Sequence, residues 1–67
     1  MADVARVTKV TAASEKSFKD AVDHGLDKAS NSLRNITGLE VIEQKAKVEN
    51  GSIKEYRVKL EITFILE

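Results

Sequence analysis

The spacing of apolar side chains predicts one helix. From Phe18 onward, apolar or small residues recur every three or four positions, which places them along one face of an α-helix. Ser17 can cap its amino end by accepting a hydrogen bond from the amide of Asp20, whose carboxylate also suits the positive helix end. The helix is expected to end at Asn35 or Gly38, after about 17 residues. Its apolar face comprises Phe18, Ala21, Val22, Gly25, Leu26, Ala29 and Leu33, and Gly25 indicates either close packing on a sheet or mere tolerance.

Three other segments have the pattern of β-strands. Residues 4–11 are rich in β-branched side chains, and residues 39–48 and 53–66 follow the helix. The order strand, helix, strand, strand predicts a single α+β domain over residues 1–67, in which helix and sheet bury their apolar faces against each other. The last two strands are expected to share one apolar face made of even-numbered residues, namely Ile42, Ala46, Val48, Tyr56, Val58, Leu60, Ile62, Phe64 and Leu66.

The turn between the last two strands must keep these apolar residues on one face. A two-residue Asn50-Gly51 turn would set Tyr56 against Lys45, so this turn is disfavoured. A three-residue loop over 49–51, with Gly51 left-handed in a β-bulge, restores the match. The expected opposite pairs are then Ile42 with Val58, Gln44 with Tyr56, Glu43 with Arg57, and Lys45 with Glu55.

The chain is short for a stable monomer. A core in a chain of 67 residues rarely supplies more than about 3–5 kcal/mol. The last strand would reach roughly 45 Å whereas the helix spans roughly 26 Å, so residues 64–66 are expected to overhang. Leu39 and Val41 are expected on the face opposite Ile42, without cover. Both arguments favour association with other copies of the chain.

Composition excludes several classes of function. Eleven Lys and Arg balance eleven Asp and Glu, so the chain lacks the excess of cations that a nucleic-acid binder needs. No apolar run approaches the roughly 20 residues that cross a bilayer, and residues 1–6 lack the apolar stretch of a signal peptide. We therefore expect a soluble, cytoplasmic protein. The absence of Cys and of a glycine-rich loop, with a single His, argues against an enzyme.

One group of side chains has the chemistry of a divalent-cation site. Asp20, Asp23, His24 and Asp27 fall on the polar face of the predicted helix, where their oxygen and nitrogen atoms could converge. The alternative interpretation is an ordinary solvated acidic face, because side chains of one straight helix rarely encircle an ion. Copies related by symmetry could complete such a site.

The chain resembles the dodecins along nearly its whole length. The matching stretches are Ser17-Phe18 with Ala21, Ala29 with Ser32-Leu33-Arg34-Asn35, Glu40-Val41-Ile42-Glu43-Gln44, and Tyr56-Arg57-Val58-Lys59-Leu60 with Phe64. The resemblance implies a three-stranded antiparallel sheet wrapped on one helix, a hollow homododecamer, and storage of stacked flavins such as riboflavin or FMN without turnover. It places the flavin contacts at Gly38, Glu40, Gln44 and Arg57.

Two of these positions depart from the dodecin pattern. Flavin-binding dodecins carry a stacking Trp where this chain has Gly38, and a Gln where it has Arg57. Losing an aromatic stack costs about 1–3 kcal/mol per ring, and Arg57 cannot accept a hydrogen bond. The affinity for flavin pairs is therefore expected to fall by orders of magnitude. The alternative is a flavin-free assembly that binds divalent cations through carboxylates or acts only as a shell.

Overall fold

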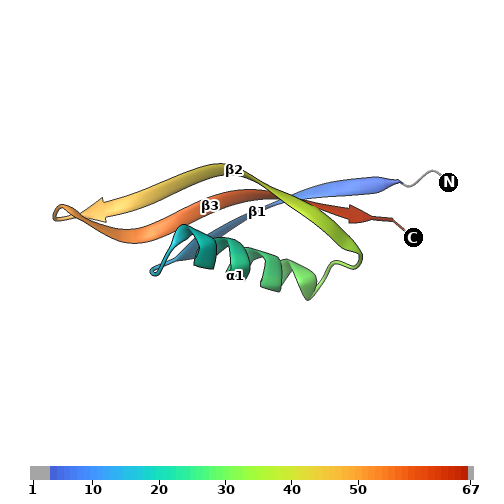
Figure 1. Cartoon of the computed structure of the whole chain (residues 1–67), viewed down its shortest axis with the longest axis horizontal. Helices are drawn as coiled ribbons and strands as arrows, with labels where there is room; N and C mark the ends of the chain where they lie inside the picture. The colour runs from blue at the N-terminus through green and yellow to red at the C-terminus, as the bar shows by residue number, and fades with distance from the viewer. Residues whose placement is uncertain (1–3, 67) are drawn as a thin grey trace.

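The computed structural model describes residues 4–66 as one helix on a long sheet (Figure 1). The elements are β1 (Ala5–Ser14), α1 (Phe18–Ser30), β2 (Ile36–Glu49) and β3 (Ser52–Ile65). This confirms the predicted order and the α+β class. Residues 1–3 and Glu67, which belong to the predicted domain, lie outside the described residues.

Helix α1 begins where the sequence predicts and ends earlier. The Ser17 side chain accepts a hydrogen bond from the Asp20 amide at 2.9 Å, as expected of an N-cap. The helix stops after 13 residues, with Asn31 as its C-cap, so the expected end at Asn35 or Gly38 is wrong. The segment 30–35 contains two Ser and two Asn, whose side chains compete with helical hydrogen bonds. Leu33 follows the helix and still packs against the core.

Strand β3 lies in the centre of the sheet, in the order β1-β3-β2, and both pairings are antiparallel. β1 pairs with it without interruption from Ala5↔Ile65 to Ser14↔Tyr56, so β1 is longer than the predicted 4–11. β2 pairs with the other edge of β3 through three register shifts. The sheet is consequently much longer than the helix, and the chain measures 54 × 19 × 13 Å.

The β2–β3 turn is a two-residue loop, so the predicted three-residue loop over 49–51 is wrong. Glu49 pairs with Ser52, so the loop contains only Asn50 and Gly51, with φ angles of 53° and 78°. Left-handed backbone at both positions is the geometry of a tight hairpin turn. The shift of register that the apolar faces require occurs instead inside the strands, between Lys47 and Val48. The opposite pairs are therefore Gln44 with Val58, Ala46 with Tyr56, Glu43 with Lys59, Lys45 with Arg57, and Lys47 with Glu55.

A second irregularity changes which residues of β2 reach the core. The register shifts again between Val41 and Glu43, so that Ile42 is the extra residue of a β-bulge. Beyond it, Leu39 pairs with Ile62 and packs against the core, which contradicts its expected place on the uncovered face. The expected core residues of this strand are exposed: Ile42 is 45% exposed, Val48 is 60% exposed, and Ala46 is also on the surface.

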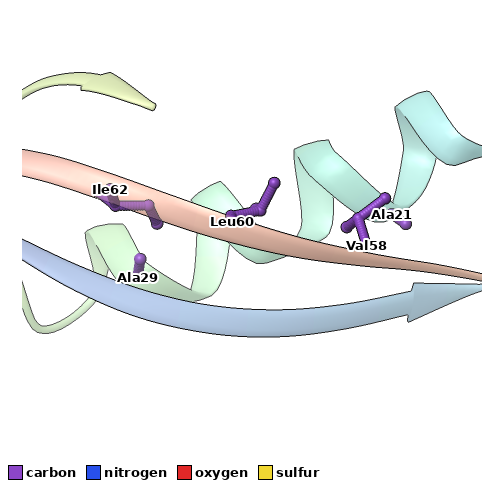
Figure 2. Close-up of a cluster of buried hydrophobic side chains, with 5 residues drawn as sticks. All are labelled: Ala21, Ala29, Val58, Leu60 and Ile62. Carbon is purple, nitrogen blue, oxygen red and sulfur yellow. The ribbon is translucent and has the colours of Figure 1, made fainter. Parts of the chain in front are cut away.

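The core is a single layer between α1 and β3. Figure 2 shows its five buried residues, Ala21 and Ala29 from α1 with Val58, Leu60 and Ile62 from β3. Gly25 brings the helix close to the sheet, because a Cβ on it would stand 2.8 Å from the Leu60 Cδ1 and 3.2 Å from the Ala12 Cβ. This confirms the close-packing interpretation of that glycine. The small core agrees with the expectation that the chain needs further contacts.

Candidate functional site

The polar face of α1 is organised around Asp20. Its Oδ2 atom accepts a hydrogen bond from Ser14 Oγ at 2.6 Å and lies 3.5 Å from Nε2 of His24. Ser14 Oγ in turn accepts from the amide of Lys16 at 2.9 Å, which ties the end of β1 to the start of α1. The hydrogen bond from Ser14 is the main cause that lowers the pKa of Asp20 below its ordinary value of 3.8. Asp20 therefore has a structural role in the β1–α1 turn.

The predicted cation ligands line one open depression of about 310 Å³, made by Asp20, Asp23, His24 and Asp27. Their charges are partly engaged already, because Asp23 Oδ2 lies 2.8 Å from the Lys19 Nζ in an exposed ion pair that raises the pKa of Lys19. Within residues 4–66, no group of three or more acidic or His side chains has the geometry to hold a metal ion. A cation site here stays a prediction that needs ligands from elsewhere.

The four predicted flavin contacts lie on two faces of the sheet. Arg57 pairs with Lys45, and Glu40 pairs with Glu61, on the face that points away from α1. Gln44 pairs with Val58 and so shares the helix side, yet it is exposed because α1 packs over β1 and β3 and hardly covers β2.

Gly38 and Arg57 are far apart in a single copy of the chain. Gly38 pairs with Thr63, six positions from Arg57 along β3, which corresponds to roughly 20 Å. Gly38 and Arg57 of the same copy therefore cannot both contact one small ring system. A site that contains both needs residues from more than one copy.

The surroundings of Gly38 are open. A Cβ built on this residue meets no atom within 4 Å, and its φ angle is not in the left-handed region. Neither close packing nor backbone conformation therefore demands glycine at this position. A larger side chain would extend into free space on the outer face of β2.

Charge pairs on the outer face differ from the predicted ones. Lys45 stands directly opposite Arg57, and like charges in this position are destabilising. Glu43 compensates, because one of its oxygens lies 3.6 Å from the Lys45 Nζ and 3.7 Å from the Lys59 Nζ. Arg57 finds its partner on its own strand, with Nε donating to Glu55 at 2.5 Å. These side chains are exposed or half-buried, so each pair contributes little to stability.

A second depression was not expected from the sequence. It has a volume of about 300 Å³ and lies between β1 and the carboxyl half of α1. The small residues at positions 12, 13 and 25 belong to its lining and are the sequence signal that could have indicated it, although Gly25 itself packs closely on Leu60 and Ala12. Its lining consists of Val10, Thr11, Ala12, Ala13, His24, Gly25 and Lys28.

Comparison with known proteins places this fold in a defined class, a helix packed on a long antiparallel sheet in the order β-α-β-β. The family model of the dodecins matches residues 4–67. Dodecin of Thermus thermophilus is 31% identical over 67 residues, which is 100% of this chain and 97% of that protein. The chain belongs to the dodecin family.

Solved structures agree with this assignment. Dodecin from Streptomyces davaonensis is 28% identical, with a TM-score of 0.91 and coverage of 97% of this chain and 96% of that one. Calcium dodecin of Mycobacterium tuberculosis, described as a calcium-chelating antigen with a novel calcium-binding site, is 32% identical, with a TM-score of 0.82 over 96% of this chain and 91% of that one. A variant of the Thermus thermophilus protein reaches a TM-score of 0.93 at 30% identity, over 98% of each chain.

Family membership sets the general class of function. Dodecins are non-enzymatic proteins that bind small ligands, flavins in general, and associate with copies of themselves. The predicted absence of enzymatic turnover is confirmed on this ground. Among the described residues, no helix is long and apolar enough to span a membrane.

Proposed function

We propose that twelve copies of this chain form a hollow shell that binds and stores a small ligand at contacts between the copies. The observation that carries this proposal is the imbalance between a core of five residues and the apolar surface outside it. Exposed apolar side chains that lie next to one another mark interaction surfaces, and Val48 stands directly opposite Ile53. The exposed ones are Val4, Val7, Val41, Ile42, Val48, Ile53 and Leu66, between 37% and 64% exposed.

The ligand class that we propose is the flavins, held weakly. Membership of the dodecin family supports flavin as the ligand, and the separation of Gly38 from Arg57 supports a site built by several copies. Gly38 offers no ring on which an isoalloxazine could stack, and aromatic stacking contributes about 1–3 kcal/mol per ring. We therefore expect a dissociation constant about 5-fold to 150-fold higher per lost stack than in a dodecin with a Trp at this position.

The native mass and the flavin titration test the two parts of this proposal separately. Native mass spectrometry of the purified protein is expected to give twelve times the chain mass of 7.4 kDa. A compact particle with the mass of one chain at working concentration would refute the assembly. Riboflavin fluorescence is then followed while protein is added, and the absence of quenching at protein concentrations well above micromolar would refute flavin as the ligand, whatever the mass.

A double variant tests the two departures from the family pattern. Gly38→Trp combined with Arg57→Gln is expected to bind riboflavin at least about tenfold more tightly, since about 1.4 kcal/mol of added stacking suffices for that change. The protomer has room for the new ring at Gly38. Ser52→Trp, which adds the same ring at the exposed first residue of β3, beside the hairpin turn, is the matched control for nonspecific stacking. Equal binding by the double variant, the control and the parent would show that these two positions do not contact flavin.

The second candidate function is binding of divalent cations at symmetry contacts. The similarity to calcium dodecin favours it, together with the acidic depression on α1. Calorimetric titration with calcium or magnesium is the test, and the combined variant Asp20→Asn and Asp27→Asn is expected to lose the heat of binding. A variant that binds the cations as well as the parent would exclude the helix face as the site.

A further inference from the structure

The β2–β3 turn presents the pair Asn50-Gly51 at an open end of the molecule. Every residue from 44 to 54 is exposed, and the hairpin extends past α1 (Figure 1). Asn50 and Gly51 have φ angles of 53° and 78°, and a Cβ on Gly51 would meet no atom within 4 Å. In a single copy of the chain, water therefore reaches the turn, and no other described element packs on it.

The chemistry of this pair depends on access to the Gly51 backbone nitrogen. In a two-residue hairpin turn, the ladder bonds join the flanking residues, here Glu49 and Ser52, and the amide of the second loop residue makes none. Glycine has no Cβ to hinder an approach to its nitrogen or to restrict rotation about the adjacent bonds. The Asn50 side-chain carbonyl carbon is the electrophile next to this nitrogen along the chain.

We propose that Asn50 is a site of spontaneous covalent modification, through a cyclic imide formed with the Gly51 nitrogen. The Gly51 nitrogen attacks Cγ of Asn50, a new N–Cγ bond forms, and the side-chain amide leaves as ammonia with the proton from the peptide nitrogen. One water then opens the imide. Opening at the side-chain carbonyl gives an ordinary aspartyl residue, and opening at the backbone carbonyl gives the isoaspartyl linkage. Neither an enzyme nor a redox partner takes part.

The product changes the end of the hairpin in two ways. Each copy gains one negative charge beside Glu49, in a chain whose formal charge is otherwise zero. The isoaspartyl form also adds a methylene group to the backbone of a turn that contains only two residues, and a tight turn sets the register of its strands. Modification is therefore expected to loosen the pairs nearest to the turn, Glu49↔Ser52 and Val48↔Ile53.

The chain provides its own controls, because it has two other Asn residues. Asn31 caps α1 and is followed by Ser32, whereas Asn35 has a φ angle of 61° and is followed by the β-branched Ile36. Asn35 thus shares the left-handed backbone of Asn50 but has a hindered neighbour. The carbonyl of Asn35 also accepts a hydrogen bond from the Ile65 amide at 3.1 Å, which holds this segment against β3.

The experiment is incubation of the intact assembly at mildly alkaline pH and 37 °C, with peptide mass mapping of all three Asn sites over time. Conversion at Asn50 is expected to be at least about tenfold faster than at Asn31 or Asn35, which corresponds to a barrier lower by about 1.4 kcal/mol. The products should be both aspartate and isoaspartate, distinguished by fragmentation. Gly51→Ala, which hinders the attacking nitrogen, is expected to slow the conversion by a similar factor.

The same measurement in urea separates the effect of the local sequence on the rate of conversion from the effect of the folded structure. Rapid conversion of Asn50 in both the folded and the unfolded protein supports the proposal. Conversion at Asn50 that is as slow as at Asn35 in the folded assembly, but fast in urea, would show that the folded turn or a neighbouring copy protects the site, and the proposal would be wrong. Slow conversion in both states would refute the chemistry itself.

Discussion

Replacement of Gly25 by alanine tests the contact between α1 and the sheet. In an exposed helix this change stabilises by about 1 kcal/mol, because alanine is the better helix former. Here the new Cβ would stand 2.8 Å from Cδ1 of Leu60, which is fully buried, and 3.2 Å from the Ala12 Cβ. Overpacking of this kind typically costs about 1–3 kcal/mol. The cost exceeds the gain, so we expect a net loss of about 1 kcal/mol.

Urea unfolding at one fixed protein concentration measures this loss, since association makes stability depend on concentration. Gly38→Ala is the matched control, because it adds the same methyl group where no atom lies within 4 Å. Its stability should stay within about 0.5 kcal/mol of the parent. A Gly25→Ala variant more stable than the parent would refute the clash.

A double-mutant cycle with Leu60→Ala identifies the atom responsible. Leu60→Ala alone should destabilise by about 2–5 kcal/mol. In that background the methyl group of Gly25→Ala enters space that the leucine has vacated, so the second substitution should become neutral or stabilising. An equal loss in both backgrounds would mean that Leu60 is not the limiting contact, and Ala12 would take its place.

Two further predictions concern the amino end of α1. Ser17→Ala removes the acceptor for the Asp20 amide and should lower the free energy of unfolding by about 1 kcal/mol, and an unchanged urea midpoint would contradict this. The pKa of Asp20 is lower in the folded chain than its ordinary value of 3.8. The Asp20 carboxylate therefore stabilises the folded chain fully at pH values above 3.8, and this stabilisation is lost as the pH falls through the lowered pKa. Asp20→Asn and Ser14→Ala should therefore flatten the acid side of the stability curve, and identical acid unfolding of parent and variants would show that the Ser14–Asp20 hydrogen bond contributes nothing.

Several features were predictable because they depend on local patterns. The three- and four-residue spacing after Ser17 and the capping side chain predicted where α1 begins, and the strict alternation in 53–66 predicted β3 and its inner face. The acidic helix face was also predictable, since Asp20, Asp23, His24 and Asp27 line one depression. The partners of these carboxylates were less predictable, because the hydrogen bond from Ser14 to Asp20 and the ion pair of Lys19 with Asp23 depend on which neighbours the fold supplies.

The errors cluster in β2, whose sequence is compatible with several registers. Its apolar residues do not alternate, so the bulge at Ile42 could not be placed before the partner strand was known. One extra residue moved Leu39 from the expected outer face to the core and left Ile42 exposed. Val48 is exposed for another reason, because the hairpin extends past α1. A second register shift, between Lys47 and Val48, lets the strands be joined by the two-residue Asn50-Gly51 loop and still places the apolar residues of both strands on one face.

The amino-acid sequence by itself determined the element order, the helix cap, the inner face of β3 and the family, because each depends on neighbours along the chain or on motifs read in order. Only the tertiary structure decided how β2 aligns with β3, and therefore that Leu39 reaches the core while Ile42 is exposed. The physical reason is that a strand has a side-chain period of two, so a single bulged residue reverses which face every later side chain occupies. The position of the bulged residue in the strand depends on the sum of contacts along the whole sheet.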